Sequence, residues 1–181
     1  MIGSALPALA ETAPKQVLNF VNNHLSRLDV LFTKTGSFPF SSWPHTNLLW
    51  ALELISLEPE LFEESVEVLL VLEKNYGSTI AQNYSNSPIN SLVNLFLPWK
   101  SNAHVEVTEK MQILRRMSRS YPDMAYRLVG RILTTHTSIP PMQPRYRQNP
   151  TEKSVTWEQY FSSCNELTAI FVNLMAGRED L

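Results

Sequence analysis

The sequence predicts an all-α fold in which antiparallel helix pairs stack on one another. Two observations lead to it: a proline-centred pattern recurs three times, and apolar residues at helical spacing flank each proline. Because a proline is tolerated at the first position of a helix, each one marks the start of the second helix of a pair. The prolines are Pro14, Pro59 and Pro122. Equivalent apolar residues stand eight positions before and seven positions after them: Leu6 and Val21, Ala51 and Val66, Leu114 and Val129.

The first predicted pair covers residues 4–31 and is broken at Thr12 and Ala13. After Pro14, apolar residues follow the spacing of one helix face, so a single helix is expected to reach Leu31. The core-facing residues of that helix are Val17, Leu18, Val21, Leu25 and Leu28, with Phe20, Leu31 and Phe32 broadening the face.

The second and third pairs are expected at residues 44–76 and 108–135. The recurring prolines are 45 residues apart the first time and 63 the second, and the extra 18 residues match a short inserted helix predicted at residues 87–97. A period near 45 residues lies within the range of HEAT and armadillo repeats. The predicted fold class is therefore an α-solenoid, or superhelix, in which antiparallel helix pairs form a right-handed stack.

The chain ends in a proline-rich loop followed by one more helix. Residues 136–153 hold four prolines and no helical period, which indicates an extended loop. The last helix is expected at residues 156–177, where Thr156 and Gln159 have the spacing of a capping box. Its apolar stripe has no later helix to cover it, which favours a single helical-repeat domain over residues 1–181 cut from a longer chain. The stripe comprises Trp157, Tyr160, Phe161, Cys164, Leu167, Phe171, Leu174 and Met175.

Composition indicates a cytoplasmic protein without membrane contact. A chain of 181 residues can bury a core without disulfides or metals. One cysteine suits a reducing compartment, no apolar run is long enough to span a membrane, and residues 1–9 lack the pattern of a signal peptide. The net charge of −2 hides opposed blocks, with balances of −5 over residues 1–99, +6 over 100–153 and −3 over 154–181.

Five phrases, in this order, cover most of the chain: Leu6-Pro-Ala-Leu-Ala-Glu-Thr-Ala-Pro14, Pro44-His-Thr-Asn-Leu-Leu-Trp-Ala-Leu52, Ser87-Pro-Ile-Asn-Ser-Leu92, Phe96-Leu-Pro-Trp99 and Pro144-Arg-Tyr-Arg147. Together they resemble the helical-repeat regions of very large, mostly uncharacterised bacterial proteins. Some members of that group look like STAND-type signalling NTPases associated with defence against phage. The resemblance implies a sensor or scaffold arm, because this chain has no nucleotide-binding motif.

Catalytic and metal-binding patterns are missing from the sequence. No phosphate loop, dinucleotide-binding turn or nucleophile elbow occurs, and the five glycines are scattered. None of the four histidines has another histidine or the cysteine at metal-ligand spacing. Cys164 is expected to be a small core residue. We therefore expect no enzyme, no metal and no cofactor, since a hydrolase would need a cleft with convergent ionisable groups.

The first candidate binding surface is basic. Two arginine pairs at one-turn spacing lie on the two helices of the third pair, where antiparallel packing would gather them into a patch that attracts phosphate or an acidic protein surface. The alternative is a solvated face, or ion pairs with acidic residues such as Glu109 and Asp123. An Arg-Tyr-Arg group in the proline-rich loop either docks into a neighbouring groove or pins the loop to its own body. The candidates are Arg115, Arg119, Arg127, Arg131, Arg145, Tyr146 and Arg147.

The second candidate surface comprises Trp43, His45 and Asn47, where aromatic anchors stand beside polar groups. The alternative is structural, with Thr46 or Asn47 capping a helix and Trp50 packed in the seam. Trp99 is expected in the core, with an interface anchor as its alternative.

The function expected from these patterns is a non-catalytic scaffold or recognition module, whose partner is a protein or an adjoining domain of a larger bacterial chain. The alternative is a helical module that binds nucleic acid or phosphate through the basic 110–147 region.

Overall fold

The computed structural model describes residues 2–32, 45–80, 86–99, 105–135 and 155–179. All regular secondary structure in these residues is helical, so the predicted all-α class is confirmed. None of the helices in these ranges has the length and low polarity needed to cross a membrane. The chain divides into two compact units: residues 1–92 with 142–150, and residues 93–141 with 151–181.

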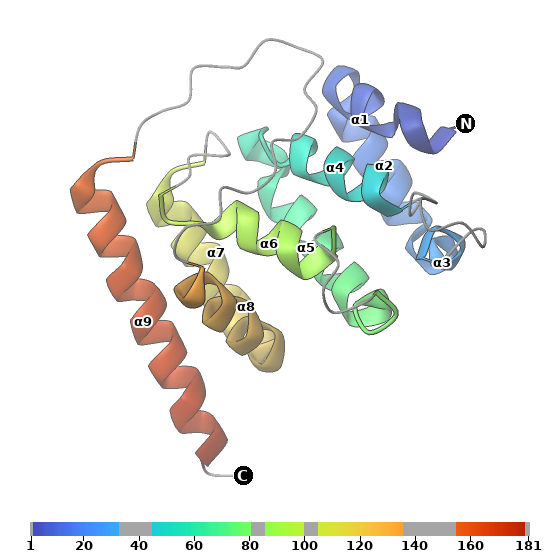
Figure 1. Cartoon of the computed structure of the whole chain (residues 1–181). Helices are drawn as coiled ribbons and strands as arrows, with labels where there is room; N and C mark the ends of the chain where they lie inside the picture. Colours follow the sequence, from blue (N-terminus) through green and yellow to red (C-terminus); the bar gives the residue numbers. More distant parts are fainter. Residues whose placement is uncertain (1, 33–44, 81–85, 100–104, 136–154, 180–181) are drawn as a thin grey trace. The chain divides into compact units, whose positions relative to one another are not determined.

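The first unit is built around a close helix pair, α1 (Ile2–Thr12) and α4 (His45–Ile55). Figure 1 shows α1 beside α4, which it contacts more extensively than α2, its neighbour in sequence. Small buried side chains on the two helices, Ala10 and Ala51, suit such a close approach. The other helices of this unit are α2 (Pro14–Asn23), α3 (Asp29–Phe32), α5 (Pro59–Tyr76) and the beginning of α6 (Pro88–Phe96).

Each of the three recurring prolines starts a helix, as the pattern predicts. α2 begins at Pro14, α5 at Pro59 and α8 (Pro122–Thr134) at Pro122. At this position the ring supplies a helical φ, and the missing N–H removes a group that would have no partner within the helix.

The helix predicted from Pro14 to Leu31 is interrupted at His24. α2 ends at Asn23, a 3₁₀ turn covers Leu25–Arg27, and α3 begins at Asp29. The imidazole Nδ1 of His24 lies 2.8 Å from the carbonyl oxygen of Phe20, the acceptor that the His24 N–H would use in a continuous α-helix. That N–H donates instead to the Val21 carbonyl at 3.0 Å. The α-helical hydrogen-bond pattern therefore ends at His24, where the imidazole contacts the carbonyl that the backbone N–H would use.

Two buried carboxylates hold the start of α6 within the first unit. Glu73 on α5 accepts a hydrogen bond from the Ile89 N–H at 3.2 Å, and Glu53 on α4 accepts one from the Ser91 hydroxyl at 2.5 Å. The Ile89 N–H lies in the first turn, where helix N–H groups have no partner within the helix and negative charge is favoured. These contacts attach α6 to α4 and α5.

The second unit contains α7 (Val107–Ser120), α8 and α9 (Trp157–Glu179). Each of the three contacts the other two, and Figure 1 shows α9 running alongside α7 and α8. Their buried apolar residues form a shared core because they recur at three- and four-residue spacing along each helix. These residues are Met111, Ile113, Leu114, Met117, Ala125, Leu128, Val129, Ile132, Leu167 and Ile170.

The contact between α8 and α9 depends on a glycine and a stack of rings. A β-carbon at Gly130 would lie only 3.3 Å from the ring of Phe171, so glycine leaves the room this ring occupies. Phe171 also stacks on Tyr126, with ring centroids 5.0 Å apart. The guanidinium of Arg178 lies 4.1 Å from the centroid of the same tyrosine ring and forms an ion pair with Asp123. These contacts fix the C-terminal half of α9 on α8.

Candidate functional site

One face of α9 exposes large apolar side chains. Its inner face buries Ser163, Leu167 and Ile170, whereas a second row recurs every three or four residues along the helix. The exposed fractions of its large members are 76% for Trp157, 57% for Phe161, 56% for Val172 and 41% for Met175. A contiguous exposed apolar patch is typical of an interaction site. This row, called the outer stripe below, comprises Trp157, Phe161, Cys164, Thr168, Val172 and Met175.

The start of α9 is held by the predicted capping box, which is confirmed. The Gln159 N–H donates to Thr156 Oγ1 at 3.2 Å, and the Thr156 N–H donates to Gln159 Oε1 at 3.0 Å. Two N–H groups without helical partners are satisfied reciprocally in this way. The box also fixes the position of the residues next to Thr156, Val155 and Trp157.

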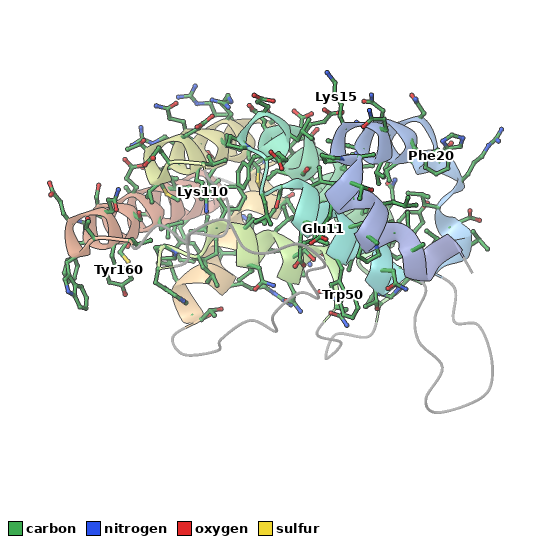
Figure 2. The ribbon with its side chains drawn as sticks, turned by 90° about the horizontal axis from the view of Figure 1, so that it is seen from above. Glu11, Lys15, Phe20, Trp50, Lys110 and Tyr160 are labelled. Atoms are coloured by element: carbon green, nitrogen blue, oxygen red, sulfur yellow. The ribbon has the colours of Figure 1, made fainter. Side chains whose placement is uncertain are left out.

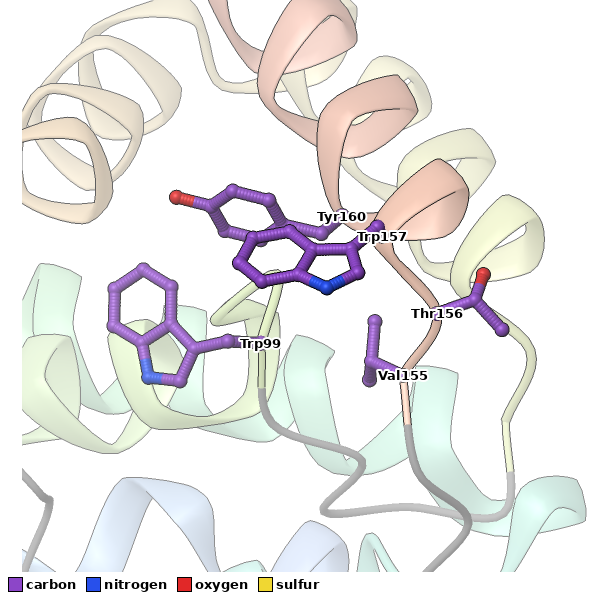
Figure 3. A pocket seen from close by; sticks show the side chains of 5 residues that line it. All are labelled: Trp99, Val155, Thr156, Trp157 and Tyr160. Carbon is purple, nitrogen blue, oxygen red and sulfur yellow. The ribbon is translucent and has the colours of Figure 1, made fainter.

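A cavity of about 370 Å³ opens at this end of α9, within the second unit. Its volume falls in the range of small-ligand sites, about 300–1,000 Å³. Figure 3 shows the side chains of the described residues that line it, and none of these is charged. They are Trp99, Val155, Thr156, Trp157 and Tyr160.

Three aromatic rings form the walls of this cavity. The rings of Trp157 and Tyr160 meet edge to face, with centroids 6.0 Å apart and planes at 85°. The rings of Trp99 and Tyr160 have centroids 6.5 Å apart and planes tilted by 55°. The rings therefore present surfaces in different directions. Tyr160 projects from α9 (Figure 2), and a hydrogen bond with the neighbouring Cys164 side chain raises its pKa, which keeps the hydroxyl protonated.

The basic candidates on α7 and α8 are exposed, and Arg115 takes part in an ion pair. Arg115 and Arg119 lie on α7, and Arg127 and Arg131 lie on α8, all four at the surface. Arg115 forms an ion pair with Glu166 of α9, with Nη2 and Oε1 3.4 Å apart. This contact favours the ion-pair alternative for Arg115, although a different acidic residue supplies the partner. The group at residues 145–147 lies outside the described residues.

The second candidate surface contains a buried residue. His45 is fully buried at the start of α4; its ring stacks on Phe32 with centroids 5.0 Å apart, and its Nε2 lies 3.1 Å from the Asn86 carbonyl oxygen. Desolvation by burial lowers the pKa of His45 below its ordinary value of 6.5, against hydrogen bonds with backbone groups that raise it. His45 therefore packs inside the first unit and does not lie on a surface. Asn47 is half-buried, and Trp43 lies outside the described residues.

The location of one residue of this site, Trp99, differs from the one predicted from the sequence. It was expected in the core, yet 38% of its surface is exposed and it lines the cavity. The Pro98-Trp99 pair directly after α6 and the Thr156-Trp157 pair at the start of α9 were visible signals, because each puts a tryptophan at a helix end. The two tryptophans come close together through tertiary packing, which the local sequence around either one does not predict.

Within the ranges that the structure describes, no group of three or more histidine, cysteine, aspartate or glutamate side chains is arranged to hold a metal ion. No protein-family model, curated protein or solved structure matches the chain.

Proposed function

We propose that the chain is a non-catalytic interaction module, a scaffold or sensor arm of a larger bacterial protein, built as a stack of HEAT-like helix pairs. The observation that carries the proposal is the outer stripe of α9, which exposes four large apolar side chains beside the buried face of the same helix. Its occupant is an amphipathic helix, supplied by an adjoining repeat or by a partner protein. Such a helix would cover the stripe as α7 and α8 cover the inner face.

Helix contacts support the repeat architecture. Helices next to each other in sequence touch in each predicted pair, α1 with α2, α4 with α5, and α7 with α8. The first helices of the first two pairs pack together, as α1 and α4, and the second helices touch as α2 and α5. α9 contacts both helices of the third pair, the place that the first helix of a fourth pair would take.

The experiment that tests the function places a photo-crosslinking amino acid on the stripe in the source cell. We expect p-benzoylphenylalanine at Val172 to crosslink to an apolar helical segment, whose sequence shows whether it belongs to the same chain or to a partner. The matched control is the same substitution at Asn173, the next residue, which is exposed and lies off the stripe. Equal crosslinking at the two positions would refute the proposal.

A second candidate function is binding of nucleic acid or phosphate through the basic 110–147 region, which the exposure of Arg119, Arg127 and Arg131 favours. Binding of a labelled single-stranded DNA should weaken steeply with salt, and reversing the charges of Arg127 and Arg131 should lower the slope by about 1.4, at about 0.7 per phosphate contact. Binding that is absent or insensitive to salt rejects this function.

A further inference from the structure

The cavity at the start of α9 differs from the outer stripe in shape and chemistry. The stripe is an open helix surface, whereas the cavity is a concave space of about 370 Å³ with three aromatic walls. The two share Trp157, but Trp99 belongs to the cavity alone and Val172 to the stripe alone. A ligand for the cavity can therefore be tested separately from the helix that we propose for the stripe.

The polar groups of the cavity mainly donate hydrogen bonds. The indole N–H groups of Trp99 and Trp157 have no hydrogen-bond partner among the described residues, and an indole N–H can only donate. Figure 3 shows the indole nitrogen of Trp157 on the edge of its ring nearest the space between Trp99 and Val155. The hydroxyl of Thr156 is already engaged in the capping box. A complementary ligand therefore brings acceptors and needs few donors.

The lining of the cavity favours neither a positively nor a negatively charged ligand, and it is compatible with an apolar one. None of the described lining residues carries a formal charge, and the rings of Trp99, Trp157 and Tyr160 supply flat, polarisable surfaces in different orientations. A proline-rich peptide fits these conditions, because proline has no N–H to satisfy and the polyproline II helix leaves every carbonyl free to accept. Its pyrrolidine rings pack on aromatic walls, and its preformed conformation reduces the entropy lost on binding.

We propose that the cavity formed by Trp99, Val155, Thr156, Trp157 and Tyr160 binds a proline-rich peptide in the polyproline II conformation. The aromatic walls hold the proline rings, and the indole N–H of Trp157 donates to a peptide carbonyl. This inference goes beyond the helix-docking function, since it assigns a second site with a ligand of different conformation and chemistry.

The test measures binding of an acetylated decaproline peptide to the full chain, by fluorescence anisotropy and by the shifts of the indole N–H resonances. We expect the Trp99 and Trp157 resonances to move. Trp99→Ala should weaken binding at least about tenfold, because it removes one of the three aromatic walls and truncation of a buried aromatic anchor is among the costliest interface changes. Trp157→Phe keeps a ring and removes the donor, so about three- to tenfold weaker binding is expected.

Two controls make the outcome decisive. Val172→Asp alters the stripe and should leave decaproline affinity unchanged, whereas a Gly-Ser peptide of equal length should not bind. Trp99→Phe replaces Trp99→Ala if circular dichroism shows that the alanine variant is unfolded. Equal affinity for the two peptides, or an affinity insensitive to both tryptophan substitutions, overturns the proposal. Binding of tetramethylammonium without decaproline also overturns it, because the rings would then serve as a cation cage.

Discussion

At the scale of single residues, the most consequential group is the buried imidazole of His45. Phe32 stacks on it and on Tyr76, with ring centroids 5.0 Å and 4.3 Å apart, so the imidazole forms part of a row of three rings between α3, α4 and α5. Desolvation lowers its pKa, and the neutral form is therefore the one that the folded chain holds.

The lowered pKa of His45 predicts that stability falls as the pH drops below about 6.5. In that range the unfolded chain binds a proton that the folded chain does not, so the free energy of unfolding rises with pH and is lost on acidification. The loss continues until the pH reaches the lowered pKa, with a slope of up to about 1.4 kcal/mol per pH unit. Urea unfolding between pH 5 and pH 8 measures it, and His45→Gln should flatten the curve. An unchanged slope in that variant would contradict the prediction.

Gly77 provides a second prediction at the scale of residues. Replacing it with alanine should destabilise the fold, whereas replacing a glycine in a helical conformation with alanine usually stabilises it. Its φ of −57° suits any residue, so Gly77→Ala would ordinarily stabilise by about 0.4–1 kcal/mol. A β-carbon there would lie 2.5 Å from the carboxylate of Glu73, which accepts the Ile89 N–H. Displacing that carboxylate leaves a buried N–H unsatisfied, at a cost of about 1–3 kcal/mol.

Chemical denaturation should therefore show Gly77→Ala to be destabilised. The matched control is Gly177→Ala on α9, where no atom lies within 4 Å of the added carbon and a gain of up to about 1 kcal/mol is expected. A stabilised Gly77→Ala would mean that the Glu73 contact contributes little to the position of α6.

At the scale of elements, the capping box of α9 predicts a local response. Thr156→Ala removes the acceptor of the Gln159 N–H, and such N-cap losses cost about 1 kcal/mol. Hydrogen exchange should quicken at the first-turn amides of α9 more than near Leu167, because the rest of the helix stays packed on α7 and α8. Thr168→Ala is the control: among the described residues its hydroxyl bonds to the Cys164 carbonyl alone, within the same helix, so exchange in the first turn should not change.

Helix starts could be predicted from sequence because their causes are local. The prolines at the first positions of α2, α5 and α8 and the Thr156–Gln159 pair act within one turn of chain. The stop at His24 is also local, since the His24 N–H bonds to the Val21 carbonyl, but the apolar spacing beyond it is still that of a helix. Periodicity indicates the side that a residue faces and does not indicate where the backbone hydrogen-bond pattern changes.

At the scale of the whole molecule, burial depends on which helices meet. Phe20 and Phe32 both belonged to the predicted core face, yet Phe32 is buried whereas Phe20 is 57% exposed, stacks on His24 and projects from α2 (Figure 2). The break after α2 redirects the chain between these two residues, so one helical pattern cannot place both. The aromatic cavity was missed for the same reason, since Trp99 and Trp157 are far apart in sequence.

The outer stripe of α9 predicts that the isolated chain self-associates as its concentration rises, because a contiguous exposed apolar patch is an association site when no partner covers it. Light scattering should give an average mass that increases with concentration, and Val172→Asp should suppress the increase. Asn173→Asp adds the same charge one position away, off the stripe, and should have little effect. Attraction between the opposed charge blocks is the competing cause of association, and salt distinguishes the two causes. About 1 M salt shortens the Debye length to about 3 Å and leaves apolar contacts intact. Association that disappears at that salt concentration, or that both substitutions reduce equally, would assign it to charge.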